Sequence, residues 1–164
     1  MQGRSEYKTR CGKFKRIGDG IQTNCIANDC YTYDFYFRNK PVDKKWIDKG
    51  MCTMHAWLLR MFDNLKETGH RCKMDNLFNS VSLARAAYKL PSKVLVHGVI
   101  RKSGRGVPPV VLQEELGGKR ADAVRGTVKV AVLKDDSESH DLLVASCYDQ
   151  KPFYMISHSV QEVT

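Results

Sequence analysis

Residues 71–100 read RCKMDNLFNSVSLARAAYKLPSKVLVHGVI, and this stretch decides the fold class. Its first residues form a short strand-like segment that ends at an aspartate. Ser80 or Ser82 can cap a helix that follows, and Pro91 closes this helix. Residues 94–100 are mostly apolar and predict a buried strand. The stretch therefore predicts a strand, a helix and a second strand, with a carboxylate directly after the first strand.

The residues upstream predict a hairpin and a long helix. Residues 21–27 are fairly apolar, and residues 31–37 are rich in aromatic side chains. The link between them is short and turn-like, so we expect two antiparallel strands. A helix is expected over residues 53–68, where Thr53 can cap the start and Gly69 can end it.

The residues downstream predict further strands. After the loop at 101–106, a moderately helical stretch is expected over 108–115. Strands are then expected over 127–133, 142–148 and 153–156, with an acidic turn at 135–141 between the first two. Strand pairs, alternating helices and closing strands make an α/β or α+β domain. This order is compatible with a ribonuclease H-like layout, although other folds share it.

The charge and length of the chain limit its class and partners. The chain has 164 residues, which suits one domain, and a net charge of +9 that favours polyanions such as nucleic acid. Residues 1–20 are polar and basic, and are interpreted either as a solvated lead-in or as an arm lying on a phosphate backbone. No apolar run is long enough to cross a bilayer and no signal peptide begins the chain, so we expect an intracellular protein without a membrane partner.

The cysteines and histidines show no metal pattern. No Cys-x-x-Cys pair occurs, and reduced buried thiols are the expectation for an intracellular protein. His97 lies inside an apolar strand and is interpreted as a core residue.

Asp75 is the candidate for chemistry, and we expect it near the carboxyl end of a central strand. A carboxylate at the carboxyl end of a strand is well placed in a site crevice, and Mg²⁺ prefers oxygen ligands. A phosphoryl-transfer site needs at least two such carboxylates. The first expected strand carries Asn24 at its centre, which leaves Asp29 at the turn and Asp34 on the second strand as candidate partners. The alternative is that Asp75 and Asp29 serve only as cap and turn residues.

The loop at residues 101–106 is the candidate phosphate contact. Arg101, Lys102 and Arg105 supply positive charge, and the glycines allow the backbone to approach a ligand closely. The loop lacks the pattern of a nucleotide-binding P-loop. A solvated basic surface loop is the alternative.

The chain resembles the piggyBac transposases. Residues 74–80 resemble the Asp-Asn-x-Phe/Tyr-x-Ser segment around that family's second catalytic aspartate, and four other segments follow in the family's order. These segments are residues 31–39, 94–109, 126–129 and 148–152. The resemblance implies an α/β, ribonuclease H-like mixed sheet with flanking helices over residues 21–164, incomplete at the C-terminal end.

The resemblance also implies a function. It points to a nuclear, DDE-type transposase-derived domain that uses Mg²⁺ or Mn²⁺ on DNA, with Asp75 and Asp29 as catalytic metal ligands and Arg101, Lys102 and Arg105 on DNA. Asn24 stands where the family's first aspartate is expected, and the family's remaining carboxylates follow the last strand. We therefore expect at most one weakly held metal ion and no turnover. The alternative is a non-catalytic DNA-binding or interaction module that retained the fold.

Overall fold

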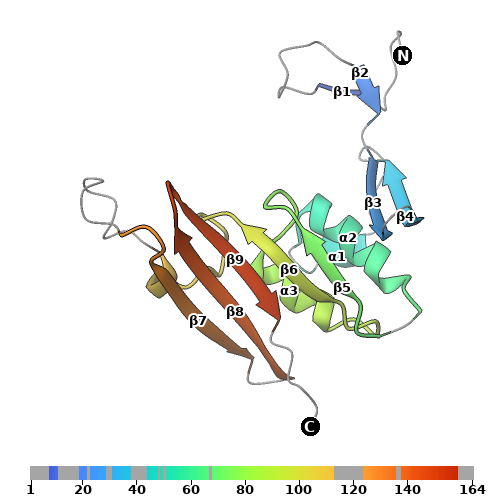
Figure 1. Ribbon diagram of the computed structural model, residues 1–164. Coiled ribbons are helices and arrows are strands. Elements are labelled where there is room, and N and C mark those ends of the chain that lie inside the picture. Colours follow the sequence, from blue (N-terminus) through green and yellow to red (C-terminus); the bar gives the residue numbers. More distant parts are fainter. Residues whose placement is uncertain are drawn as a thin grey trace. The chain divides into compact units, whose positions relative to one another are not determined.

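The computed structural model describes residues 8–10, 19–21, 23–28, 31–37, 44–47, 49, 51–66, 68–112, 124–135 and 138–158 (Figure 1). Two compact units divide the chain, Met1–Met61 and Phe62–Thr164. This division falls within a helix. The boundary at residue 20 that the sequence predicts is a different one, and it stays a prediction.

The first unit contains two strand pairs. β3 (Thr23–Asn28) and β4 (Tyr31–Phe37) are antiparallel, as the sequence predicts, with a register shift between Ile26 and Ala27. β1 (Lys8–Arg10) and β2 (Asp19–Ile21) also pair antiparallel. No sequence pattern predicts this pair, because three-residue polar strands have no hydrophobic period.

Two helices follow the hairpin. α1 (Lys44–Ile47) is one turn long and buries Trp46. α2 (Thr53–Asp63) starts where the sequence predicts but ends five residues early. The N–H of Leu65 donates to the carbonyl of Phe62 at 3.1 Å, a tight turn that closes the helix. Gly69 has a φ of 80° and lies beyond this turn, so it does not cap α2.

The second unit is built on a five-stranded sheet in the order β5-β6-β9-β8-β7. β5 (Arg71–Met74) and β6 (Leu95–Ile100) are parallel, and the other neighbours are antiparallel. The remaining strands are β7 (Val128–Asp135), β8 (Glu138–Tyr148) and β9 (Pro152–His158). The sheet is therefore mixed.

Two of the predicted segments differ from the structure in detail. Asp135 pairs with Glu138, so most of the expected acidic turn belongs to strands. Backbone pairing with β7 holds these polar residues extended without help from an apolar pattern. The expected helical stretch at 108–115 is a short 3₁₀ turn, η2 (Pro109–Val111), within the residues described there.

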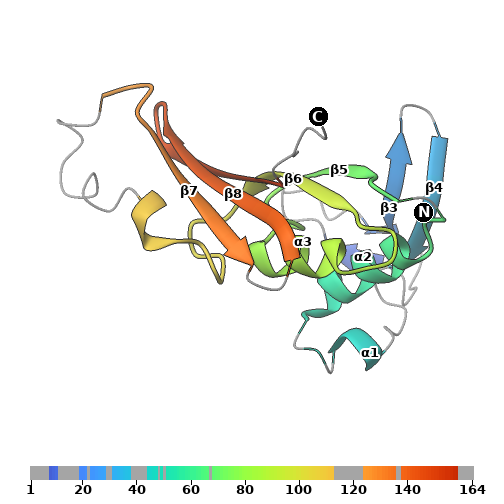
Figure 2. The ribbon, with the colours of Figure 1, turned by 90° about the horizontal axis from the view of Figure 1, so that it is seen from below.

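The core of the second unit lies between the sheet and α3 (Val81–Tyr88), the crossover that joins β5 to β6 (Figure 2). Parallel neighbours need such a crossover. The helix buries Val81, Leu83, Ala84 and Ala87. On β9, Tyr154 and Ile156 are buried while the alternate residues Phe153 and Met155 are exposed. One sheet face is thus covered and the other carries exposed apolar side chains.

Candidate DNA-contacting edge of the sheet

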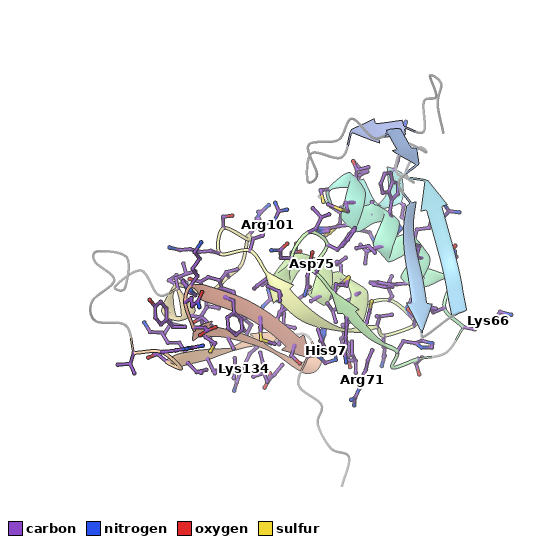
Figure 3. The ribbon with its side chains drawn as sticks, turned by 45° about the horizontal axis from the view of Figure 1, so that its top comes forward. Lys66, Arg71, Asp75, His97, Arg101 and Lys134 are labelled. Atoms are coloured by element: carbon purple, nitrogen blue, oxygen red, sulfur yellow. The ribbon has the colours of Figure 1, made fainter. Side chains whose placement is uncertain are left out.

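Asp75 lies directly after the last residue of β5 (Figure 3). Its Oδ1 accepts a hydrogen bond from the N–H of Asn76 at 2.7 Å. Its carbonyl accepts from the amides of Phe78 and Asn79 at 3.0 and 3.1 Å. Asp75 therefore starts a compact turn, and its side chain is exposed. The structure corrects one expectation, because β5 is the end strand of the described sheet and not a central one.

The cap of α3 is a different residue. Ser80 Oγ accepts a hydrogen bond from the N–H of Leu83 at 3.1 Å, which satisfies one of the free amides of the first turn. Between the two alternatives that the sequence left open, Ser80 is the cap. Asp75 is thus not needed to start the helix, and its carboxylate has no hydrogen bond other than the one to Asn76 among the described residues.

Gly98 fixes the distance between β5 and β6 at this edge. It pairs with Met74, the residue before Asp75. A Cβ added to Gly98 would lie 2.0 Å from the Met74 carbonyl oxygen, and Gly98 has a φ of 134°. Only glycine allows both this conformation and this close approach. The position of Asp75 is therefore set by the pairing of β5 with β6.

β5 and β6 end at this edge, and β9 begins there (Figure 1). A groove opens at the same place. Its volume is about 710 Å³. It is lined by Asn76, Val99, Ile100, Arg101, Lys102, Ser103, Leu112, Pro152, Phe153 and Tyr154. Crevices at the carboxyl ends of parallel strands are common ligand sites in α/β proteins.

The basic loop forms one wall of the groove. Arg101 and Lys102 line the groove and are exposed, whereas Arg105 is exposed outside the lining. The N–H of Gly104 donates to the carbonyl of Arg101 at 2.9 Å, which turns the chain. Gly106, with a φ of 88°, brings the loop against Val81 at the start of α3. The loop therefore packs against the start of α3.

The described residues do not complete a metal centre. No group of three or more His, Cys, Asp or Glu side chains among them can hold a metal ion. Asp29 lies outside the described residues, Asn24 lies opposite Tyr36 in the hairpin, and Asp34 lies on β4. The pairing of Asp75 with Asp29 therefore stays a prediction, as do the DNA contacts of Arg101, Lys102 and Arg105.

The sequence did not single out the aromatic wall of the groove. Phe153 and Tyr154 were assigned only to a strand. Their position beside the basic loop depends on β9 pairing with β6, where Ile100 lies opposite Tyr154. No local pattern predicts that pairing, because the two residues are far apart in the sequence.

Two other titratable groups of this sheet have shifted pKa values. Burial, with the positive charges of Arg71 and Lys73, lowers the pKa of His97, whose Nδ1 lies 2.7 Å from Ser157 Oγ. His97 is half-buried and not a fully buried core residue. Burial raises the pKa of Cys72 to about 11, so this thiol is not a nucleophile near neutral pH.

Comparison with known proteins identifies the fold and the family. A protein-family model described as Transposase IS4 matches residues 2–164. A cryo-EM structure of a piggyBac transposase synaptic complex with hairpin DNA matches with a TM-score of 0.68 and 19% identity. The match covers 99% of this chain and 33% of that one. No curated protein matches the sequence significantly.

These matches confirm two of the predictions. The ribonuclease H-like fold class, with its mixed sheet and flanking helix, is that of the piggyBac structure. The predicted resemblance to a piggyBac-type transposase is confirmed by the family match together with this fold. Across the part of the chain that the structure describes, no helix is long and apolar enough to span a membrane.

Proposed function

This chain belongs to the Transposase IS4 family, and from this premise we propose that it is a transposase-derived domain that binds DNA along the groove edge of its five-stranded sheet. One observation carries the proposal: two exposed cations, Arg101 and Lys102, line one groove together with Asn76, the residue next to the exposed carboxylate of Asp75. The similar structure holds hairpin DNA, and a net charge of +9 favours the same kind of partner here.

Phosphate contact is the first task that we assign to this edge. Arg101, Lys102 and Arg105 are exposed, so a phosphate backbone can reach them without unfolding the loop. Arginine can bind two phosphate oxygens at once, whereas lysine acts as a mobile point charge. These contacts carry no sequence information, so we propose weak binding to duplex DNA without sequence preference.

Salt dependence tests this role. Each phosphate neutralised on duplex DNA steepens the log–log salt dependence by about 0.9. Replacing Arg101, Lys102 and Arg105 with alanine should therefore flatten the slope by up to about 2.7, measured by fluorescence anisotropy with a labelled duplex.

A matched control removes the same charge elsewhere. Lys66, Arg71 and Lys134 are exposed cations that do not line the groove (Figure 3). Their triple alanine variant should keep most of the slope. If the control variant loses as much slope as the loop variant, binding is due to net charge alone and the groove edge is not the DNA site.

Membership in this family implies the use of divalent metal ions in general. We propose that Asp75 is one ligand for Mg²⁺ or Mn²⁺ and that Asp29 is the second candidate. The described residues do not complete a metal centre, so we expect the isolated chain to hold at most one such ion weakly and not to cut or join DNA.

Two measurements test the metal role. Calorimetric titration with Mn²⁺ should give weak binding that Asp75→Asn abolishes, because the amide brings no charge. Incubation of the chain with plasmid DNA and Mn²⁺ should give no nicking. Nicking that disappears in Asp75→Ala would show that the chain holds more carboxylates near Asp75 than we count.

A second function, a non-catalytic DNA-binding or interaction module, is favoured by the shortage of metal-binding groups among the described residues. Salt-dependent DNA binding with no response to Mn²⁺ would support it over the first function. DNA binding requires access to DNA, so we propose a nuclear location, which imaging of the tagged chain would test.

A further inference from the structure

The two walls of the groove differ in chemistry. Arg101, Lys102 and Ser103 give one wall cations and a hydroxyl, and Asn76 adds an amide beside Asp75. A second wall, next to the first, includes Phe153 from the start of β9. Its volume of about 710 Å³ lies in the range of small-molecule sites. A ligand that fits both walls has an anionic part and a flat apolar part.

Phe153 is exposed at the rim of this groove. Its exposed fraction is 39%, which is high for a large aromatic residue on a sheet. The antiparallel register pairs Ile100 with Tyr154, so Arg101 and Phe153 come next to each other at the sheet edge. A cation and an exposed aromatic ring at neighbouring positions suit a nucleotide, whose phosphate and base they can contact together.

Tyr154 offers a second sign of a ligand. The residue is 4% exposed and lines the groove, yet its hydroxyl has no hydrogen-bond partner among the described residues. A buried polar atom without a partner costs stability. A phenolic hydroxyl can both donate and accept, so the base or the phosphate of a ligand in the groove can satisfy it.

We propose that this groove holds one unpaired nucleotide of the bound DNA, with its base against Phe153 and its phosphate on Arg101. A paired base inside a duplex keeps both of its faces stacked on neighbouring bases, so it cannot lie on the ring. The inference rests on the proposed DNA binding and adds the form of DNA that the groove selects. Because Asn76 lines the groove, the nucleotide would lie beside the turn of Asp75.

The test compares two labelled DNAs by anisotropy, a short duplex and the same duplex with unpaired central bases. The wild-type chain should bind the second DNA more tightly. Phe153→Leu keeps an apolar side chain but removes the ring, and it should weaken binding to the unpaired bases by about fivefold or more while leaving duplex binding unchanged.

Met155→Leu is the matched control, because Met155 is exposed on the same strand and outside the groove lining. It should leave both affinities unchanged. If the wild-type chain binds both DNAs with equal affinity, or if the two variants have equal effects, the inference is wrong. Binding of the wild-type chain to the duplex would still support the proposed function. If the wild-type chain binds neither DNA, both proposals are wrong.

Thymidine monophosphate as competitor distinguishes a strand from a free nucleotide. A DNA strand and a free nucleotide both carry a phosphate and a base. The strand has further phosphates on either side of the bound nucleotide, which can contact Lys102 and Arg105. We expect millimolar competitor to displace the DNA only weakly. If thymidine monophosphate displaces the DNA completely at low concentration, and Phe153→Leu abolishes this competition, the groove binds free nucleotides and the inference is wrong.

Discussion

Replacing Gly98 with alanine tests how the pairing of β5 and β6 positions Asp75. The new Cβ would lie 2.0 Å from the Met74 carbonyl oxygen, and 3.1 Å from both the nitrogen and the carbonyl carbon of Met74. Real Cβ contacts essentially never fall below 3.0 Å, so the strands must separate by about 1 Å. The obstacle is backbone, so no side-chain rotation relieves it.

The expected loss has two parts. A φ of 134° is a conformation that residues other than glycine rarely adopt, which costs about 1–3 kcal/mol. Forcing a methyl group against packed backbone costs about another 1–3 kcal/mol. The total of about 2–6 kcal/mol is a large share of the 5–15 kcal/mol that stabilises an ordinary domain.

Gly69→Ala separates these two parts. Gly69 also has a positive φ, 80°, but an added Cβ there would meet nothing within 4 Å. It should cost only about 1–2 kcal/mol. Both variants are compared with the wild type by urea unfolding followed by far-UV circular dichroism, which reports directly on the secondary structure of the sheet.

Hydrogen exchange shows where the loss falls. The amides of β5 and β6 should exchange faster in Gly98→Ala than in Gly69→Ala. Failure of Gly98→Ala to accumulate as folded protein, while Gly69→Ala accumulates, also agrees with the clash. A free energy of unfolding for Gly98→Ala equal to that of Gly69→Ala would refute the close approach and, with it, our account of how Asp75 is placed.

Three further predictions concern single side chains of this unit. Ser80→Ala removes the acceptor of the Leu83 N–H and should lower the free energy of unfolding by about 1 kcal/mol in urea; an unchanged value would refute the cap. Because the folded pKa of His97 lies below its ordinary 6.5, the unfolded chain protonates first as the pH falls. The free energy of unfolding should therefore decline below about pH 6.5. In His97→Gln it should decline less over the same pH range, as urea unfolding would show. Exposed Cys52 should be alkylated by iodoacetamide faster than Cys72, whose pKa is about 11, as peptide mass spectrometry would show; equal rates would contradict the burial of Cys72.

Local signals predicted the local elements of this fold. A capping serine, an apolar run and a proline were enough for α3 and β6, and two aromatic or apolar runs with a short link were enough for the β3–β4 hairpin. Sequence patterns did not predict the features that depend on tertiary contacts. The tight turn at Leu65 ended α2 before Gly69, and pairing with β7 held the polar start of β8 extended.

The site was only half predictable for the same reason. Asp75 and the basic loop follow strands that can be recognised one at a time, and parallel pairing brings their ends to one edge. The position of β9 between β6 and β8 comes from long-range pairing, so the sequence could not place Phe153 beside Arg101. That β5 is the end strand of the described sheet also depends on strand order, which no periodicity encodes.

The charges at this edge explain why it can serve a ligand at little cost to the fold. Asp75 and Arg101 are both exposed, and Asp75 forms no ion pair among the described residues. An exposed pair would stabilise the protein by only about 0–1 kcal/mol, so leaving the two groups apart costs almost nothing. The carboxylate then stays available for a cation, and the guanidinium stays available for a phosphate. Because Gly98 and the Ser80 cap hold the backbone next to Asp75, we expect most of the ordering cost of binding to fall on the side chains.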